Sequence, residues 1–418
     1  MKLALIGAGA RGMIYARYAF AVKGMEIMAV VEPNEERRHI AAEEFQIPEE
    51  MQFTCAEDFF RKGKLCEIAV IASMDRDHYE ETMAALETGY DILLEKPISP
   101  DPQECLRIQK KADEAGRQVI ICHVLRYTNF FSKIKEIVDS GRIGKIISID
   151  HSENIGNFHM AHSFVRGNWR NSDLSSPLIM QKSCHDMDIL VWLTGSDAKT
   201  ISSFGSLTYF KEENAPAGSA DRCLECSVAD SCRFDARKQY LPIAGSWPAS
   251  VVTPSRSPET LLECLKTSPY GRCVYRCDNN VCDHQVSIIE FENGVTATFH
   301  LCGFTNKIHR TIHIMCEDGE IYGDDGNNTI MVTRFASNDV AEFETETIHP
   351  GYTLGGHGGG DTGLMEDFLR KMETRDFSDS RSAISCSIES HLMAYAAEQS
   401  RVTGKTIDMK ELKKTLTD

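Results

Sequence analysis

The chain has 418 residues, of which 42% are hydrophobic and 26% charged, so it is long and apolar enough for two folded domains. A formal net charge of -17 argues against nucleic acid or an anionic membrane surface as the main partner, because both favour basic proteins. No apolar run approaches the roughly 20 residues of a membrane span, and Arg11 interrupts the apolar start too early for a signal peptide. We therefore expect a cytoplasmic protein with neither a membrane nor a nucleic acid partner.

The first part of the chain alternates between two hydrophobic periods. Apolar runs typical of buried strands are separated by helical patterns, as at 77–88 and 102–115. The strand-like runs cover residues 2–6, 26–31, 67–72, 91–94 and 118–122. This alternation predicts an α/β domain over residues 1–123, in which a doubly wound parallel sheet has helices on both faces.

A glycine pattern, "GAGARG", follows the first predicted strand and opens the first predicted helix. Gly7, Gly9 and Gly12 permit a tight turn and let backbone amides approach a pyrophosphate. Glu32 ends the second strand about 20 residues further on, where a carboxylate accepts hydrogen bonds from an adenosine ribose. Because that carboxylate would repel a 2′-phosphate, the pattern predicts a Rossmann-type domain that binds NAD in preference to NADP. A glycine-rich turn beside a surface glutamate is the alternative.

From residue 133 onward, strand-like runs follow one another. They predict an α+β domain over residues 124–418 with a mostly antiparallel open sheet, through which we expect the protein to form a homo-oligomer. Asn293-Gly294 between two of the runs is a strong hairpin signal. Residues 212–284 lack clear periodicity and are rich in Cys, Pro, Gly and Ser, which predicts an insertion. The strand-like runs cover residues 143–154, 200–210, 285–291, 295–301, 310–315 and 329–335.

Several motifs resemble the Gfo/Idh/MocA family of sugar and cyclitol oxidoreductases across nearly the whole chain. They are "GAGARG", the strand-end Glu32, "SMDRDH", "EKPIS", "HVLRY" and "HDMDILVWLTG", of which "EKP" is the most specific. The resemblance implies a nicotinamide cofactor, a carbohydrate-like substrate and a lysine, Lys96, beside the reacting carbon. The predicted cofactor-binding residues are Gly7, Gly9, Arg11, Gly12, Glu32, Ser73, Met74, His78, Glu95, Lys96 and His123.

Lys96 follows a strand-like run, at the kind of position where open α/β folds gather their chemistry. Oxidising a secondary alcohol sends a hydride to the cofactor and a proton away from oxygen, so a donor or acceptor side chain must reach that hydroxyl. Lys96 fits this role. The alternative is a strand-end lysine that pairs with its neighbour Glu95.

The run "PLIMQKSCHDMDILVWLTG" reads as a helix with one polar stripe, formed by Gln181, His185, Asp188 and Trp192. His185 can exchange a proton near neutral pH, and Asp188 one turn later would fix its tautomer. The family usually has an aspartate where Gln181 stands. Lys96 and His185 are therefore the predicted proton-transfer residues, with Lys182 as a further catalytic cation or substrate anchor. A core histidine with satisfied hydrogen bonds is the alternative.

Residues 157–171, "NFHMAHSFVRGNWRN", combine aromatic and basic side chains just before that helix. Aromatic faces stack on sugar rings and guanidinium groups bind hydroxyls or carboxylates, so we expect a substrate pocket here, although interdomain packing explains the residues about as well. The later run 355–361, "GGHGGGD", places His357 and Asp361 either at the rim of that pocket or in a helix cap. The predicted substrate-binding residues are Arg126, Tyr127, His162, Arg166, Trp169, Lys182 and His185.

Seven of the fifteen cysteines lie in the predicted insertion, and six of them form the candidate metal cluster: Cys223, Cys226, Cys232, Cys273, Cys277 and Cys282. We expect a structural zinc ion there, which would stabilise a segment with too little apolar content to fold unaided. Cys277 and Cys282 are alternatives for the fourth ligand, and reduced thiols, a disulfide or an iron–sulfur cluster are alternatives for the whole site. The predicted ligands are Cys223, Cys226, Cys232 and Cys273.

These features predict an NAD-dependent enzyme that transfers a hydride between a nicotinamide cofactor and a secondary hydroxyl of a sugar, sugar derivative or cyclitol. One alternative is an NAD-dependent glycoside-cleaving enzyme that works through a transient keto-sugar. A second is a non-catalytic, nicotinamide-dependent sensor. The presence of both Lys96 and His185 counts against the sensor, because a sensor needs no proton-transfer groups.

Overall fold

The computed structural model describes residues 1–338, 343–351, 353 and 356–417, so Gly355 of the "GGHGGGD" run lies outside the described residues. The first sheet has six parallel strands in the order β3-β2-β1-β4-β5-β6. The strand order reverses between β1 and β4, which is where doubly wound sheets bind dinucleotides. Their bounds are Lys2–Ile6 (β1), Glu26–Val31 (β2), Gln52–Phe53 (β3), Ile68–Ile71 (β4), Asp91–Leu94 (β5) and Val119–Ile121 (β6).

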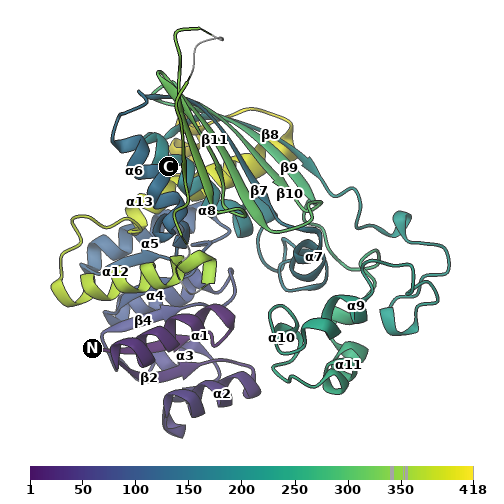
Figure 1. Cartoon of the computed structure of the whole chain (residues 1–418). Helices are drawn as coiled ribbons and strands as arrows, with labels where there is room; N and C mark the ends of the chain where they lie inside the picture. The colour runs from purple at the N-terminus through teal and green to yellow at the C-terminus, as the bar shows by residue number, and fades with distance from the viewer. Residues whose placement is uncertain (339–342, 352, 354–355, 418) are drawn as a thin grey trace.

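Helices connect these strands and surround the sheet (Figure 1). The signals that begin and end α5 are local: the Asp101 carboxylate accepts a hydrogen bond from the N–H of Gln103, and Gly116 ends the helix in the left-handed region. The predicted parallel α/β domain is confirmed, and β3, with only two residues, was not predicted. The helices are Ala10–Arg17 (α1), Glu35–Phe45 (α2), Ala56–Phe60 (α3), His78–Thr88 (α4) and Pro102–Ala115 (α5).

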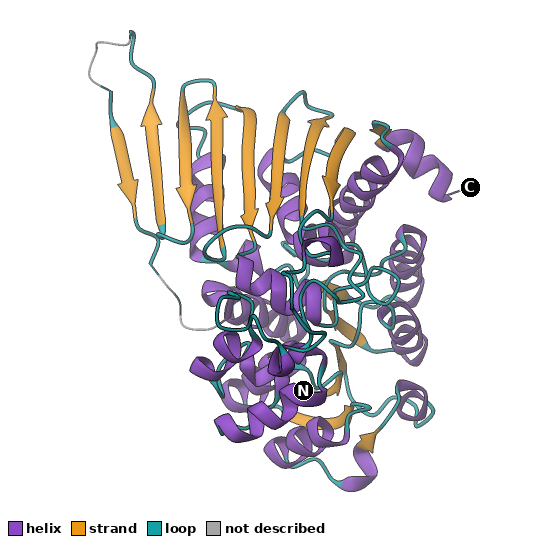
Figure 2. Cartoon of the chain, turned by 90° about the vertical axis from the view of Figure 1, so that its right-hand side faces the viewer, coloured by secondary structure: helices purple, strands orange, loops and turns teal. Residues whose placement is uncertain are grey.

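The second sheet has nine strands in the order β14-β13-β12-β11-β7-β10-β9-β8-β15 (Figure 2). β7 and β10 pair in parallel and the other neighbours are antiparallel, which confirms the predicted sheet type. β12, β14 and β15 were not predicted. The bounds are Ile146–Asn154 (β7), Ala198–Ser206 (β8), His284–Phe291 (β9), Thr296–Cys302 (β10), His309–Cys316 (β11), Gly319–Asp324 (β12), Thr329–Arg334 (β13), Thr345–Ile348 (β14) and Ile407–Asp408 (β15).

One face of the second sheet is covered by α6 (Asn129–Asp139), α8 (Leu178–Thr194) and α13 (Ile384–Thr403). The opposite face carries exposed apolar side chains such as Phe204 and Ile288, so the sheet is open on that side. The later helices are α12 (Gly360–Thr374) and α14 (Met409–Thr417). Within the described ranges, no helix is both long and apolar enough to cross a membrane.

The chain between β8 and β9 contains α9 (Ala236–Tyr240), α10 (Ala249–Val252) and α11 (Pro258–Thr267), which lie below α7 (Asn157–His159) in Figure 1. This insertion has an apolar core of its own, against which Phe158 packs. The insertion therefore buries apolar side chains of its own, and whether this segment folds unaided stays a prediction. The buried members of this core are Cys223, Ala236, Tyr240, Ala249, Leu261, Leu265 and Tyr270.

Candidate active site

The residues predicted to bind the cofactor lie along one edge of the first sheet. Because all six strands are parallel, their carboxyl ends meet at the same edge. In spatial order this edge carries Glu32 after β2, Gly7 after β1, Ser73 after β4, Glu95 after β5 and His123 after β6. An extended ligand that ran along the edge would pass these residues in that order.

Two glycines of the loop lie very close to other backbone atoms, and a third faces open space. Gly7 has a φ of +88°, and a Cβ there would lie 2.4 Å from the carbonyl oxygen of Ala72. A Cβ at Gly12 would lie 2.1 Å from the carbonyl oxygen of Gly7. A Cβ at Gly9, in contrast, would meet nothing within 4 Å. The loop therefore packs tightly on the sheet but leaves room for a ligand at the start of α1, where free N–H groups favour phosphate.

The Glu32 side chain is buried beside this loop. Its Oε2 accepts a hydrogen bond from the N–H of Ala8 at 2.9 Å, and its Oε1 accepts one from the N–H of Asn34 at 3.0 Å. The backbone thus holds the carboxylate at the end of β2, where the adenosine ribose lies in a dinucleotide-binding domain. The loop and this carboxylate together fit NAD.

Ser73, Met74 and His78 occupy the turn between β4 and α4. The Ser73 hydroxyl donates a hydrogen bond to Glu81 Oε2 at 2.5 Å. Nδ1 of His78 lies 2.8 Å from the carbonyl oxygen of Pro97, so this buried ring supports the backbone that follows Lys96. Met74 follows Ser73 directly and is partly exposed.

Arg11 connects the glycine loop to two carboxylates. Its Nε donates to Oε1 of Glu95 at 2.7 Å, and its Nη atoms donate to the two oxygens of Asp361 at 2.6 and 3.0 Å. The Tyr15 hydroxyl also donates to Glu95, at 2.6 Å. Burial favours a higher pKa for Glu95, but the charges of Arg11 and Lys96 outweigh it and hold the pKa below its ordinary value. Arg11 thereby ties the first domain to the start of α12.

The predicted catalytic lysines meet at the amino-terminal half of α8. Nζ of Lys96 donates to the backbone carbonyl of Gln181 at 2.5 Å, which joins the end of β5 to this helix. Lys182 follows, and its Nζ lies 3.3 Å from Oε1 of Glu153 on β7. Burial lowers the pKa of Lys182, and the Glu153 carboxylate opposes that change. The structure thus brings both lysines to the place where the two domains meet.

His185 lies one turn further along α8, between two other imidazoles. Its ring centre is 5.7 Å from that of His123 and 6.2 Å from that of His357. Nδ1 of His185 is buried and has no hydrogen-bond partner among the described residues. Burial lowers the pKa of His185 well below its ordinary value, and the charge of Lys96 lowers it further. The ring is therefore neutral at pH 7 and can accept a proton.

The expectation that Asp188 fixes the tautomer of His185 is wrong. Asp188 receives two hydrogen bonds from the guanidinium of Arg126, at 2.6 and 2.7 Å, and both residues are buried. Arg126 also donates to the carbonyl oxygen of Arg381 and lies over the Trp192 ring. The Asp188 carboxylate therefore neutralises the buried charge of Arg126. The same contacts occupy the Arg126 guanidinium, which was predicted to bind substrate.

The other predicted substrate-binding residues make contacts within the protein. The Tyr127 hydroxyl donates to Asp367, and Nδ1 of His162 lies 3.0 Å from the Tyr240 hydroxyl. Arg166 is fully buried. Trp169 packs against the main core. Their role in substrate binding stays a prediction.

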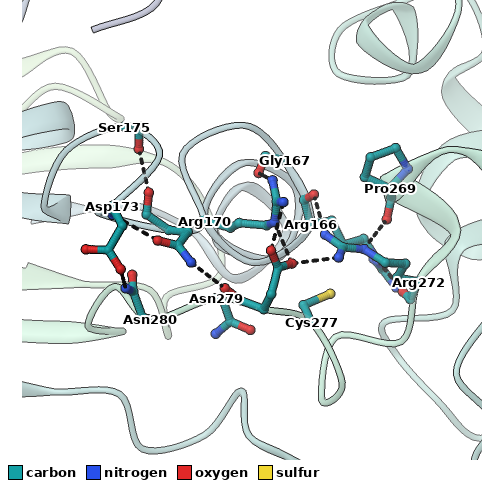
Figure 3. A network of polar contacts seen from close by, with 12 residues as sticks. Arg166, Gly167, Arg170, Asp173, Ser175, Pro269, Arg272, Cys277, Asn279 and Asn280 are labelled. Atoms are coloured by element: carbon teal, nitrogen blue, oxygen red, sulfur yellow. Dashed lines mark hydrogen bonds and ion pairs between the residues drawn. The ribbon is translucent and has the colours of Figure 1, made fainter. Parts of the chain in front are cut away.

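Much of the segment 157–171 fastens the insertion to the second domain. Arg166 donates to the carbonyl oxygens of Arg272 and Phe234 at 2.7 and 2.8 Å. Arg170 and Arg272 both bind the Asp278 carboxylate, with contacts of 2.6 to 2.9 Å, in the network that Figure 3 shows. Packing between the insertion and the rest of the second domain therefore accounts for Arg166 and Arg170, as the alternative interpretation of this segment held.

The predicted zinc site is not supported. In the part of the chain that the structure describes, no three His, Cys, Asp or Glu side chains are placed to hold a metal ion. The four predicted ligands line one cavity of about 20 Å³. All fifteen cysteines are free, and the Cys223 thiol contacts the carbonyl oxygens of Phe234 and Arg272 while Arg166 donates to its sulfur.

The sequence analysis did not select Trp247, which the structure places beside this region. The indole ring lies 5.1 Å from the ring of His159 and 6.0 Å from that of His162. Trp247 belongs to the aperiodic insertion, far along the chain from the predicted pocket. Its position in "GSWPAS" was the only available signal, since tryptophan is unusual in a turn-like run of small residues.

The first sheet is parallel and carries a glycine loop of the dinucleotide-binding type. A cluster of lysines and histidines lies where it meets the second domain. These features are typical of an oxidoreductase of the NAD-binding class. Residues 1–123 match the family model for the oxidoreductase NAD-binding Rossmann fold, and residues 135–409 match the model for the family's C-terminal α/β domain. The chain belongs to the Gfo/Idh/MocA family of oxidoreductases.

Named relatives and solved structures agree with this assignment. The chain is 24% identical over 326 residues to the putative oxidoreductase YteT of Bacillus subtilis, with 74% of each chain covered. It is 29% identical over 210 residues to inositol 2-dehydrogenase of Corynebacterium glutamicum, a match that spans 48% of this chain and 56% of that enzyme. Its fold is similar to that of levoglucosan dehydrogenase bound to NADH, with a TM-score of 0.70, 16% identity and coverage of 98% and 99%.

Proposed function

We propose that the protein is an NAD-dependent dehydrogenase that oxidises a secondary hydroxyl of a sugar, sugar derivative or cyclitol. The observation that carries this proposal is the meeting of Lys96, Lys182 and His185 where β5 ends against α8. This cluster adjoins the sheet edge that fits NAD. Oxidation of an alcohol requires a proton acceptor and hydrogen-bond donors beside the cofactor, and these three residues supply them.

The chemistry divides between the cofactor and the protein. NAD, when bound, supplies the acceptor for the hydride that leaves the carbinol carbon. Burial and the charge of Lys96 lower the pKa of His185 and so keep its ring neutral, and this neutral ring takes the hydroxyl proton as the hydride leaves. The amino group of Lys96 donates a hydrogen bond to the hydroxyl oxygen as it becomes a carbonyl, and its contact with the Gln181 carbonyl holds it in position. Lys182 binds a second hydroxyl of the substrate.

The relatives support a polyhydroxylated ring as the substrate class. Inositol 2-dehydrogenase and levoglucosan dehydrogenase, by their names, act on a cyclitol and on an anhydrosugar. Such rings carry several hydroxyls, which fits a site with two lysines and several imidazoles. We infer a cytoplasmic enzyme of central or peripheral carbohydrate metabolism.

The test is a substrate screen with two readouts. Purified protein with NAD is mixed with cyclitols, free sugars and glycosides, and both NADH absorbance and released sugar are followed. Formation of one NADH per oxidised ring is the expected result. Release of sugar from a glycoside without net NADH would instead indicate the glycoside-cleaving alternative. Binding of NAD without either product would favour the sensor.

We also propose that the open face of the second sheet pairs with a second copy of the chain. This face exposes large apolar side chains that a monomer would leave in water: Phe204, Ile288 and Tyr322 are 64%, 55% and 44% exposed. Light scattering should give a mass of at least twice the 46.8 kDa chain. Replacing Phe204 and Ile288 by lysine should return the protein to a monomer, and an unchanged mass would contradict this interface.

A further inference from the structure

The insertion presents an aromatic ring to the segment that leads into the active site. Trp247 lies between α10 and the short helical turn Leu241–Ile243. Its ring meets that of His159 edge to face, at 5.1 Å and 83°. The side chain is 51% exposed, whereas Trp169 and Trp192 pack against the main core. A large aromatic side chain held this way at a domain boundary keeps ring surface available for a ligand.

His159 connects this ring to the catalytic cluster. Its Nδ1 is buried and has no hydrogen-bond partner among the described residues. Burial lowers the pKa of His159 well below its ordinary value, and the nearby charges of Lys182 and Lys96 lower it further. The neutral imidazole therefore lies within electrostatic reach of both lysines and in contact with Trp247. A buried polar atom without a partner costs free energy unless a ligand or water satisfies it.

The contacts around Trp247 hold the insertion against this segment. The ring of His162 stacks on that of Tyr270, with centres 4.7 Å apart and an interplanar angle of 14°. Phe158 packs into the apolar core of the insertion. Because neighbours on both sides of His159 are anchored in the insertion, the distance from Trp247 to the catalytic cluster is set by packed side chains.

We propose that Trp247 and His159 form a substrate subsite supplied by the insertion, which binds a pyranose or cyclitol ring. The indole stacks on the apolar C–H face of the ring, and Nδ1 of His159 makes a hydrogen bond with one of its hydroxyls. The inference rests on the proposed dehydrogenase function and adds the side chains that select its substrate. It assigns the insertion a part in recognition in addition to its packing role.

The experiment compares Trp247→Ala, Trp247→Phe and His159→Ala with the wild type on the best substrate of the screen. Loss of one stacking contact should raise KM about tenfold with kcat changed much less, since about 1.4 kcal/mol corresponds to a factor of ten. Trp247→Phe should keep most of the affinity, because a flat ring remains. Val402→Ala, which removes an exposed apolar side chain near the end of α13, is the control and should leave KM unchanged.

A second readout does not depend on turnover. Myo-inositol and D-glucose are titrated into the protein with NADH present, and tryptophan emission is followed. We expect one of them to change the emission of the wild type and not that of Trp247→Phe. Turnover with a KM that Trp247→Ala and His159→Ala leave unchanged would overturn the subsite while the dehydrogenase stands. Absence of both turnover and an emission change across the whole screen would overturn both proposals.

Discussion

Arg11 and Asp361 lie 350 positions apart in the sequence and form a two-point ion pair, with N–O distances of 2.6 and 3.0 Å. Arg11 lies in the first turn of α1, and Asp361 lies in the first turn of α12. Glu95 shares the same guanidinium, at 2.7 Å. This pairing connects the cofactor loop, the residue before Lys96 and the C-terminal part of the chain, so it holds the cofactor edge against the second domain.

We expect Asp361→Asn to destabilise the protein. Removing one partner of a buried ion pair costs about 3–5 kcal/mol, and the lower end applies because Glu95 still pairs with Arg11. Thermal unfolding should show a Tm lower by roughly 3–4 °C. Asp58→Asn breaks the exposed pair with Arg61 and serves as the control, since such pairs contribute about 0–1 kcal/mol. Equal Tm shifts in the two variants would contradict the assigned role of Asp361.

The stabilisation by Asp361 should depend on pH. Burial favours a higher pKa for Asp361, but His357 and Arg11 outweigh it and hold the pKa below its ordinary value. A carboxyl group with a lowered folded-state pKa stabilises the fold above its unfolded pKa of about 3.9, and this contribution is lost as the pH falls towards the folded-state value. The Tm difference between wild type and Asp361→Asn should therefore be full at pH 7 and shrink below about pH 4. A Tm difference that stays constant down to pH 3 would contradict this pH dependence.

Lys96→Ala should separate chemistry from cofactor binding. A positioned donor or acceptor contributes about 10²-fold or more to the rate, so turnover should fall by at least that factor. NAD affinity, measured by calorimetry, should change little, because the glycine loop and Glu32 are expected to bind the rest of the cofactor. Lys62→Ala, an exposed lysine after α3, is the control. A Lys96→Ala enzyme with nearly the wild-type rate would remove Lys96 from the mechanism.

His185→Ala should lose turnover while the protein stays folded, because the ring borders the cluster of Lys96 and Lys182. Since the pKa of His185 is lowered, the wild-type rate should remain constant from pH 8 down to about 6.5, the ordinary value for histidine, and fall only at lower pH. A fall in kcat that begins above that pH would show that another group takes the proton. If the main effect of the substitution is a large drop in Tm, His185 is a structural core residue.

Cofactor preference tests the role of Glu32. Its carboxylate, held by the N–H groups of Ala8 and Asn34, would meet the 2′-phosphate of NADP with like charge. NAD should bind at least about tenfold more tightly than NADP, a difference of about 1.4 kcal/mol. Glu32→Gln should narrow that difference. Equal affinities of the wild type for both cofactors in calorimetry would be inconsistent with this placement.

Local patterns were sufficient to predict most of the first domain, although not its two-residue strand β3. β1, β2, β5 and α5 begin and end where the hydrophobic period, Asp101 and Gly116 indicate, because each signal lies within a few residues of the boundary that it sets. β14 and β15 were not predicted, because they are short edge strands whose pairing depends on distant chain segments. β12 contains two glycines, which obscure the alternation of a strand.

The candidate site was predictable where one segment carries the signal and unpredictable where two distant segments meet. Helical spacing correctly put His185 and Asp188 on one helix, but only the fold reveals that Arg126 takes the Asp188 carboxylate. Cysteine spacing suggested a metal in the insertion, yet Tyr240 and Leu261 give this segment an apolar core that composition alone did not reveal. Trp247 contacts His159 from the same insertion, so no local pattern identified it.

The central claim is that a hydride passes from the substrate to NAD at this site, and transfer of deuterium tests it most directly. The best substrate of the screen is prepared with deuterium on the carbon that carries the reacting hydroxyl, and the NADH formed is examined by NMR. The account predicts one deuterium at C4 of the nicotinamide per product molecule, with a slower rate than for the unlabelled substrate. Product formed while the NADH carries no deuterium, or product formed without any reduction of NAD at any stage, would contradict hydride transfer at this site.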